Sequence, residues 1–192
     1  GFINDAVKHP LGEDYALMVE ILKKNFEGLS DDDIQGALKN VVYAFSDDNT
    51  TASLDNLIIE LAGIVGNLES MGVTSNKVTD LGFKDTMDFA QQFIDDSYLK
   101  KAVDGETVAT KAVIRVCVIK NDIHSQFPVL LAQQLGFFEK YGISVALSAD
   151  TNGGGVSLNL IGGKCDFGMM GSSPISINAI NGGYIHVDEV EA

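Results

Sequence analysis

Apolar residues in the first half of the chain recur every three or four positions, which is the spacing of an amphipathic helix. Polar or glycine-containing stretches separate these stripes, so the pattern predicts a series of helices. The predicted helices cover residues 15–26, 34–45, 54–68 and 83–93. Ser30 and Asp33 have the spacing of a capping box, which predicts the start of the second of these helices.

The pattern changes after residue 112. Apolar runs of strand length alternate there with helical patterns, and these runs cover residues 113–119, 143–147 and 165–169. Strands that alternate with helices predict βαβ units and a parallel sheet. In the helix after the first strand, Pro128 is expected in the opening turn. The apolar side chains of this region that we expect to face the sheet are Leu130, Leu131, Leu135 and Phe138.

These patterns divide the chain into a helical segment (1–102), a linker of small polar residues (103–112) and a β/α segment (113–192). A short apolar run at residues 184–187 predicts a last strand. We expect the parts to fold together as one α/β domain. It would be a single lobe, with a parallel-rich sheet flanked by helices and the N-terminal all-helical segment packed on it.

Polar, flexible turns follow all three apolar runs. Ligands of parallel sheets bind at the carboxyl ends of the strands, where helices begin and their N–H groups point outward. Ordinary helix caps and tight turns use the same residue types, so a purely structural role stays open. The predicted ligand-binding residues are Asn121, Asp122, His124, Ser125 and Gln126 in the first turn, Thr151, Asn152, Gly153 and Gly154 in the second, and Gly171, Ser172 and Ser173 in the third.

Sequence motifs of catalysis are absent from these turns. The glycine run at residues 152–155 lacks the spacing of a dinucleotide or P-loop motif. Residues 171–174 are not a G-x-S-x-G elbow, and His124 beside Ser125 is adjacency rather than a triad. No catalytic residue and no cofactor are therefore predicted. Asp166 starts a strand, far from the ligand edge, and is expected to be structural.

The formal net charge of −14 argues against nucleic acid and anionic membranes as partners. Residues 1–105 carry 19 acidic and 8 basic side chains, so most of this charge lies in the helical half. No apolar run approaches the roughly 20 residues of a membrane span. No signal peptide is visible, and the start at Gly1 is expected to reflect a removed leader or an excised piece.

The two cysteines, Cys117 and Cys165, each fall in a predicted strand. Their pattern favours two buried small apolar residues, and a disulfide between them stays open because it needs a geometry that sequence does not show. The histidines are scattered at His9, His124 and His186, and no C-x-x-C or H-x-x-x-H spacing occurs. No metal site is therefore predicted.

The β/α segment resembles a known family. Residues 127–145 read FPVLLAQQLGFFEKYGISV, residues 160–168 read LIGGKCDFG, and residues 172–174 read SSP. These patterns resemble the first lobe of ABC-transporter substrate-binding proteins, type 2 periplasmic-binding fold, in the branch of nitrate/sulfonate/taurine (SsuA-like) and NMT1/THI5-like proteins. The helical segment more weakly resembles the helices that close such proteins at their C-terminus, which implies a circularly permuted order or a junction between tandem copies.

The resemblance implies two α/β lobes that close on a small molecule without chemistry, with binding residues in the same three turns. It implies a solute-binding component, or one lobe of it, that serves an ABC permease outside the cytoplasm and takes up a sulfonate, nitrate or thiamine-precursor pyrimidine. Nothing like the second lobe follows residue 187. We therefore expect weak binding by the isolated chain, unless a homodimer or a swap of residues 1–102 against 113–192 completes the site.

Two alternatives stay open. Relatives of this fold include thiamine-pyrimidine and menaquinone-pathway enzymes, but the pyrimidine synthases use a histidine and a cysteine-rich iron motif. Only two separated cysteines are present here, which disfavours the enzyme. The other alternative is a sensor or interaction module outside transport, with the acidic helical half as the partner surface.

Overall fold

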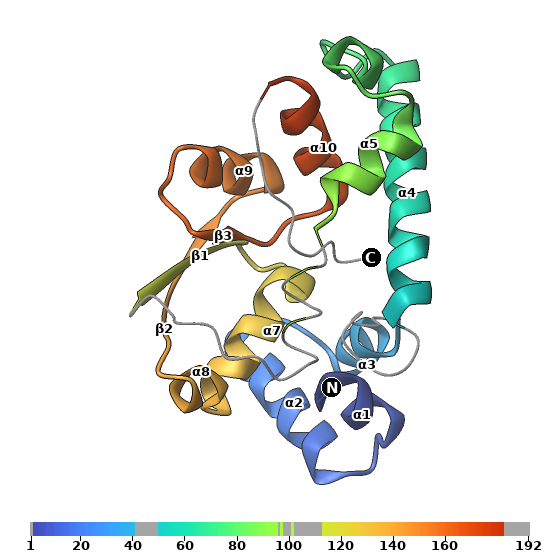
Figure 1. The fold of residues 1–192 in the computed structure, drawn as a ribbon. Helices are drawn as coiled ribbons and strands as arrows, with labels where there is room; N and C mark the ends of the chain where they lie inside the picture. Colours follow the sequence, from blue (N-terminus) through green and yellow to red (C-terminus); the bar gives the residue numbers. More distant parts are fainter. Residues whose placement is uncertain (1, 41–49, 96, 98–100, 102–112, 183–192) are drawn as a thin grey trace.

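A computed structural model describes residues 2–40, 50–95, 97, 101 and 113–182 (Figure 1). The predicted α/β architecture is confirmed: helices precede a small parallel sheet that is flanked by helices. The predicted linker at 103–112 and the predicted strand at 184–187 lie outside the described residues. The first elements in chain order are α1 (Phe2–Lys8), α2 (Glu13–Asn25), α3 (Asp31–Asn40), α4 (Thr50–Ser70), the 3-10 helix η1 (Val78–Leu81) and α5 (Thr86–Phe93).

The β/α part forms a three-stranded, all-parallel sheet in the order β2-β1-β3. Its elements are β1 (Val113–Ile119), α7 (Ile123–Gln134), α8 (Phe137–Lys140), β2 (Ser144–Asp150), α9 (Gly153–Ile161), β3 (Phe167–Gly168) and α10 (Ser172–Ile180). β1 has the predicted bounds and pairs with β2 along its whole length, from Val113 opposite Ser144 to Ile119 opposite Asp150.

β3 is shorter than its apolar run predicts. Only Phe167 and Gly168 pair as strand residues, opposite Val116 and Cys117 of β1. One residue earlier, the Asp166 carboxylate accepts the Arg115 N–H at 2.9 Å. In a longer strand, a main-chain carbonyl would accept the hydrogen bond from this N–H; here a side chain accepts it instead.

Both faces of the sheet are covered, as expected for parallel strands. Val116 and Val118 of β1 point to one face and pack with Val129 of α7. Cys117 points to the other face, where Val156 of α9 belongs to the same buried cluster. Figure 1 shows α7 and α9 on opposite sides of the strands.

The helical segment reaches the β/α part at two places. Helices α1, α2 and α3 form one buried cluster, to which α7 contributes Phe127 and Leu131. Helices α4 and α5 and the 3-10 helix form another, to which α10 contributes Ile180. In Figure 1, α3 lies by the N-terminal end of α4, whereas α5 lies beside its C-terminal half. The helical segment thus packs mainly on α7 and α10 of the β/α part.

This arrangement corrects the predicted orientation of α7. Leu131 is buried in the cluster with α1–α3, and Leu130 and Leu135 pack against that cluster instead of the sheet. Phe138 does pack on the sheet side, as predicted. α7 is buried on two sides, so apolar spacing alone does not say which stripe meets the strands. Pro128 lies at the sixth position of α7, later than the predicted opening turn.

Helix starts are set by local side chains. The predicted capping box before α3 is confirmed: Ser30 Oγ accepts the Asp33 N–H at 3.1 Å, and Asp33 Oδ2 accepts the Ser30 N–H at 2.9 Å. The hydrogen bonds from Ser30 hold the pKa of Asp33 below its usual value. α5 begins at Thr86, later than predicted, because Asp85 caps it by accepting the Asp88 N–H.

Candidate functional site

The carboxyl ends of the three strands lie at one edge of the sheet, which we call the carboxyl edge (residues 120–122, 151–152 and 169–171). Ile119 and Asp150 are opposite each other, and the Lys120 N–H donates to the Asp150 carbonyl at 2.7 Å. α7, α9 and α10 all begin directly after this edge. All three predicted turns therefore share one edge, while their ligand role stays a prediction.

The first turn is held by its own side chains. Asp122 caps α7 by accepting the Ser125 N–H at 2.9 Å. Ser125 is 2% exposed, and its Oγ accepts the Ile119 N–H at 3.1 Å. The Gln126 amide donates to the Ile119 carbonyl at 2.8 Å. Asn121 (φ 59°) and His124 are exposed at this turn, so these two present side chains to solvent.

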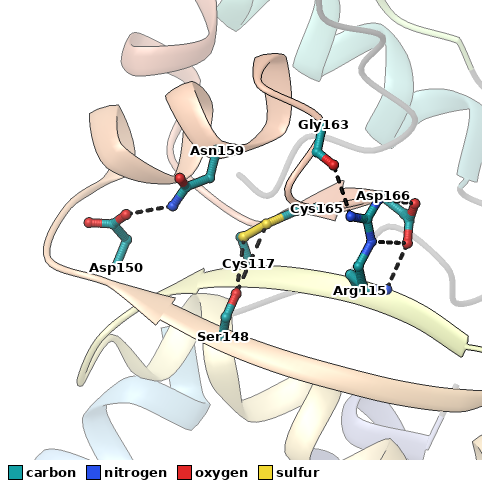
Figure 2. Close-up of a disulfide and its surroundings, with 8 residues drawn as sticks. All are labelled: Arg115, Cys117, Ser148, Asp150, Asn159, Gly163, Cys165 and Asp166. Carbon is teal, nitrogen blue, oxygen red and sulfur yellow. Dashed lines mark hydrogen bonds and ion pairs between the residues drawn. A yellow bond between two sulfur atoms is a disulfide. The ribbon is translucent and has the colours of Figure 1, made fainter.

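The second turn is held in a similar way. Asn152 caps α9, and its Oδ1 accepts the Gly155 N–H at 3.0 Å. The Asp150 carboxylate accepts the Thr151 N–H at 2.7 Å and the Asn159 amide at 2.7 Å. Figure 2 shows Asn159 reaching from α9 to Asp150 at the end of β2. Thr151 and Asn152 remain exposed, which leaves part of the turn accessible.

Internal packing explains two glycines of the second turn. A Cβ on Gly153 would lie 2.9 Å from Pro174 Cγ, so this glycine lets the second turn meet the start of α10. A Cβ on Gly155 would overlap the Asp150 carboxylate. These contacts within the chain favour glycine at both positions, while the ligand role predicted for Gly153 stays a prediction. At Gly154 the nearest atom is Asn152 Oδ1, at 3.2 Å from an added Cβ.

The third turn lacks a side-chain cap. Gly171 occupies the cap position of α10, and no side chain accepts a hydrogen bond there. Ser172 is half-buried, with its carbonyl accepting the Ser176 hydroxyl at 2.8 Å, and Ser173 is exposed. The first amides of a helix carry partial positive charge. This turn is therefore suited to a carboxylate, sulfonate or similar acceptor.

The second and third turns are more closely connected to each other than either is to the first turn. α9 and α10 pack together, and the Asn178 amide of α10 donates to Ser157 Oγ of α9 at 2.7 Å. α7 leaves the edge on the other face of the sheet.

Two further residues, Lys120 and Asp150, were not among the predicted site residues. Their position directly after β1 and at the end of β2 is the signal that could have identified them.

At the opposite, amino edge of the sheet, an ion pair joins β1 to the residue directly before β3. Asp166 binds Arg115 through two oxygens, with Nη2–Oδ1 at 2.8 Å and Nε–Oδ2 at 3.1 Å. Arg115 Nη1 also donates to the Gly163 carbonyl at 2.9 Å (Figure 2). The hydrogen bond to Asp166 raises the pKa of Arg115. The structural role predicted for Asp166 agrees with these contacts.

The structure answers the open question about the cysteines. Cys117 and Cys165 form a disulfide with Cα atoms 5.9 Å apart, and both residues are buried, as expected for small apolar side chains (Figure 2). Ser148 Oγ lies 3.2 Å from Cys117 Sγ.

Within the described residues, histidine, cysteine and carboxylate side chains form no cluster of three or more that would hold a metal ion. None of the helices described is both long and apolar enough to cross a membrane.

Comparison with known proteins connects this geometry to a family. Residues 107–189 match the model of the NMT1-like family. No curated protein and no solved structure matches the chain. The matched residues include β1 to α10 and all three turns of the carboxyl edge, whereas the N-terminal helices lie outside the match. The sheet-forming part of the chain is thus similar to the NMT1-like family.

Proposed function

We propose that the chain is a solute-binding component, or one lobe of it, of an ABC-type uptake system for a small molecule. One observation carries the proposal: three helices begin side by side at the carboxyl edge of a parallel sheet, inside the stretch that matches the NMT1-like family. Parallel sheets bind ligands at this edge.

The chemistry of the edge favours a small polar ligand. Uncapped amides at the start of α10, the exposed Ser173 and the exposed Lys120 supply hydrogen-bond donors and a positive charge. Asn121, Thr151 and other neutral groups add donors and acceptors. A sulfonate, nitrate or a thiamine-precursor pyrimidine would use such groups.

The proposed protein binds its ligand without transforming it. Ser125, the hydroxyl nearest to His124 in sequence, is buried and bonded to the main chain of Ile119. Its hydroxyl therefore serves the turn, and a nucleophilic role would require these bonds to break. This arrangement disfavours an enzyme that uses a serine nucleophile at this turn.

The proposed site is half of a cleft. Ligand pockets of this kind bury most of a small ligand's surface, which one edge does not provide. We therefore expect weak binding by the isolated chain and tighter binding when a second copy, or an exchange of residues 1–102, supplies the facing wall. We also propose an extracytoplasmic location and an ABC permease as partner. The Cys117–Cys165 disulfide supports an oxidising compartment.

Titrations followed by NMR test this proposal, with taurine, nitrate and 4-amino-5-hydroxymethyl-2-methylpyrimidine as probes. At least one probe should shift the amide signals of residues 171–173 and leave those of residues 113–115 unchanged. Ser173→Glu should abolish the shift by placing a negative charge at the start of α10. Ser144→Glu, the same change at the exposed amino end of β2, is the matched control and should bind normally.

Two results would contradict the proposal. If no probe moves any carboxyl-edge signal, the edge is not the site. If calorimetry gives a sub-micromolar Kd for a chain that light scattering shows to be monomeric, the half-cleft argument is wrong.

A further inference from the structure

The disulfide joins the centre of the sheet to the residues just before its shortest strand. Cys117 lies in β1, and Cys165 lies two residues before β3. The two residues are 2% and 5% exposed and are packed with Val156, Met170 and Ile175. The bond closes a sequence separation of 48 residues, which includes α7, α8, β2 and α9.

Few main-chain contacts hold β3 to β1. Besides the two register pairs, the Asp166 N–H donates to the Arg115 carbonyl and the Met169 N–H donates to the Cys117 carbonyl, both at 2.8 Å. The Asp166 side chain also binds Arg115, directly before β3. Gly171, the cap residue of α10, follows β3 by three residues. The position of the third turn therefore depends on how firmly β3 stays on β1, together with the packing of α10 on α9.

We propose that the Cys117–Cys165 disulfide is a redox-sensitive crosslink that positions β3, and through it the third turn of the carboxyl edge. This inference rests on the proposed ligand-binding function for its biological meaning, although its structural part stands separately. In the oxidised protein the turn is fixed beside Gly153 of the second turn. In the reduced protein β3 detaches from β1 more often, and the third turn no longer keeps its place at the carboxyl edge.

The redox step is a thiol–disulfide exchange with a dithiol as reductant. One thiolate of the dithiol attacks a cysteine sulfur, the Cys117–Cys165 bond breaks, and a mixed disulfide forms. The second thiol of the reagent then displaces the remaining cysteine. Two electrons and two protons are transferred, so two protein thiols form and the reagent becomes a cyclic disulfide.

The physical reason for the positioning effect is conformational entropy. When β3 detaches in the oxidised protein, residue 165 stays tied to residue 117, so the opened segment has few conformations. Without the bond, the opened segment gains freedom and opening becomes more favourable. The strands β1 and β2 have no crosslink between them, and their pairing extends over seven residues each, which makes them an internal reference.

Amide hydrogen exchange of the full chain tests the inference. The Met169 N–H donates to the Cys117 carbonyl of β1. Its hydrogen should exchange at least about tenfold faster in Cys117→Ser/Cys165→Ser than in the oxidised protein. The Lys120 amide, bonded across β1 and β2, should change much less. Treating the wild-type chain with dithiothreitol should reproduce the difference, so the test survives if the double variant does not fold.

Val156→Ala is the control for general loosening of the same buried cluster, because it leaves both cysteines in place. In this variant the Met169 amide should still respond to dithiothreitol. In a ligand arm, the probe that shifts residues 171–173 in the oxidised wild type should bind at least about tenfold more weakly after reduction.

The outcomes separate the two proposals. Equal acceleration of Met169 and Lys120, no acceleration at all, or two free thiols by alkylation of the chain purified without reductant would each overturn the crosslink. Faster exchange at Met169 with no binding of any probe in either redox state would support the crosslink and count against the proposed function alone. Unchanged affinity after reduction would overturn the link between β3 and the site.

Discussion

The two edges of this small sheet use their polar groups differently. At the amino edge, Arg115, Asp166 and the Gly163 carbonyl bind one another. At the carboxyl edge, side chains such as Asp122 and Asn152 bind only the nearest turn, and the α10 start has no side-chain cap. Substitutions at the amino edge should therefore affect stability alone, whereas some at the carboxyl edge should affect binding with little change in stability.

Loss of the disulfide, which lies between the two edges, should change the stability of the protein most. Closing a separation of 48 residues lowers the entropy of the unfolded chain. Cys117→Ser/Cys165→Ser should therefore lower the free energy of unfolding by up to about 4 kcal/mol, as measured by denaturant titration. A change of only a few tenths of a kcal/mol would mean that the bond contributes little to either edge.

The next effect concerns the carboxyl edge. Gly155→Ala should destabilise the protein by about 1–3 kcal/mol, because its Cβ would overlap the Asp150 carboxylate. Gly154→Ala is the matched control and should cost clearly less, since its Cβ meets only Asn152 Oδ1 at 3.2 Å. Thermal unfolding of both variants measures the difference. Equal stability of the two would refute the assignment of Gly155 to internal packing.

A smaller effect is expected for the cap of the second turn. Asn152→Ala removes the acceptor of the Gly155 N–H and should cost about 1 kcal/mol. Asn152→Asp keeps an acceptor and should retain most of the stability. If binding of the NMR probes falls in the alanine variant and returns in the aspartate variant, the cap positions the turn. A fall in both variants would instead indicate direct contact of the Asn152 amide with the ligand.

The smallest effect is expected at the amino edge. Asp166→Asn weakens the pair with Arg115, whose side chain is 43% exposed, so solvent and salt screen much of the interaction. The melting temperature should fall slightly and the difference should shrink at high salt, while probe binding at residues 171–173 stays unchanged. Loss of probe binding in this variant would break the proposed separation between the edges.

Local signals made much of this fold predictable. The β1 bounds, the Ser30–Asp33 capping box and the parallel alternation of strands and helices depend on neighbouring residues, and the structure agrees with each. The shared edge of the three turns follows from parallel strands alone. The ligand role of those turns is a separate hypothesis that no contact in the structure decides.

The remaining features depend on side-chain contacts that spacing along the chain does not specify. Leu131 could have faced the sheet or another helix, and the cluster with α1–α3 decides it. The pairing of Cys117 with Cys165 requires the β1–β3 register. The need for Gly155 comes from Asp150 five residues earlier, whose carboxylate turns back over the start of α9. In each case, side-chain spacing permits several partners and tertiary packing selects one.

The double attachment of the N-terminal helices has a practical consequence. Phe127 and Ile180 are 1% and 0% exposed because helices from the other half of the chain cover them. A shortened protein that starts near residue 103 would keep the whole stretch similar to the NMT1-like family, yet it would present both side chains to water. We expect such a fragment to aggregate during expression, so the boundary of sequence similarity is a poor place to cut this chain.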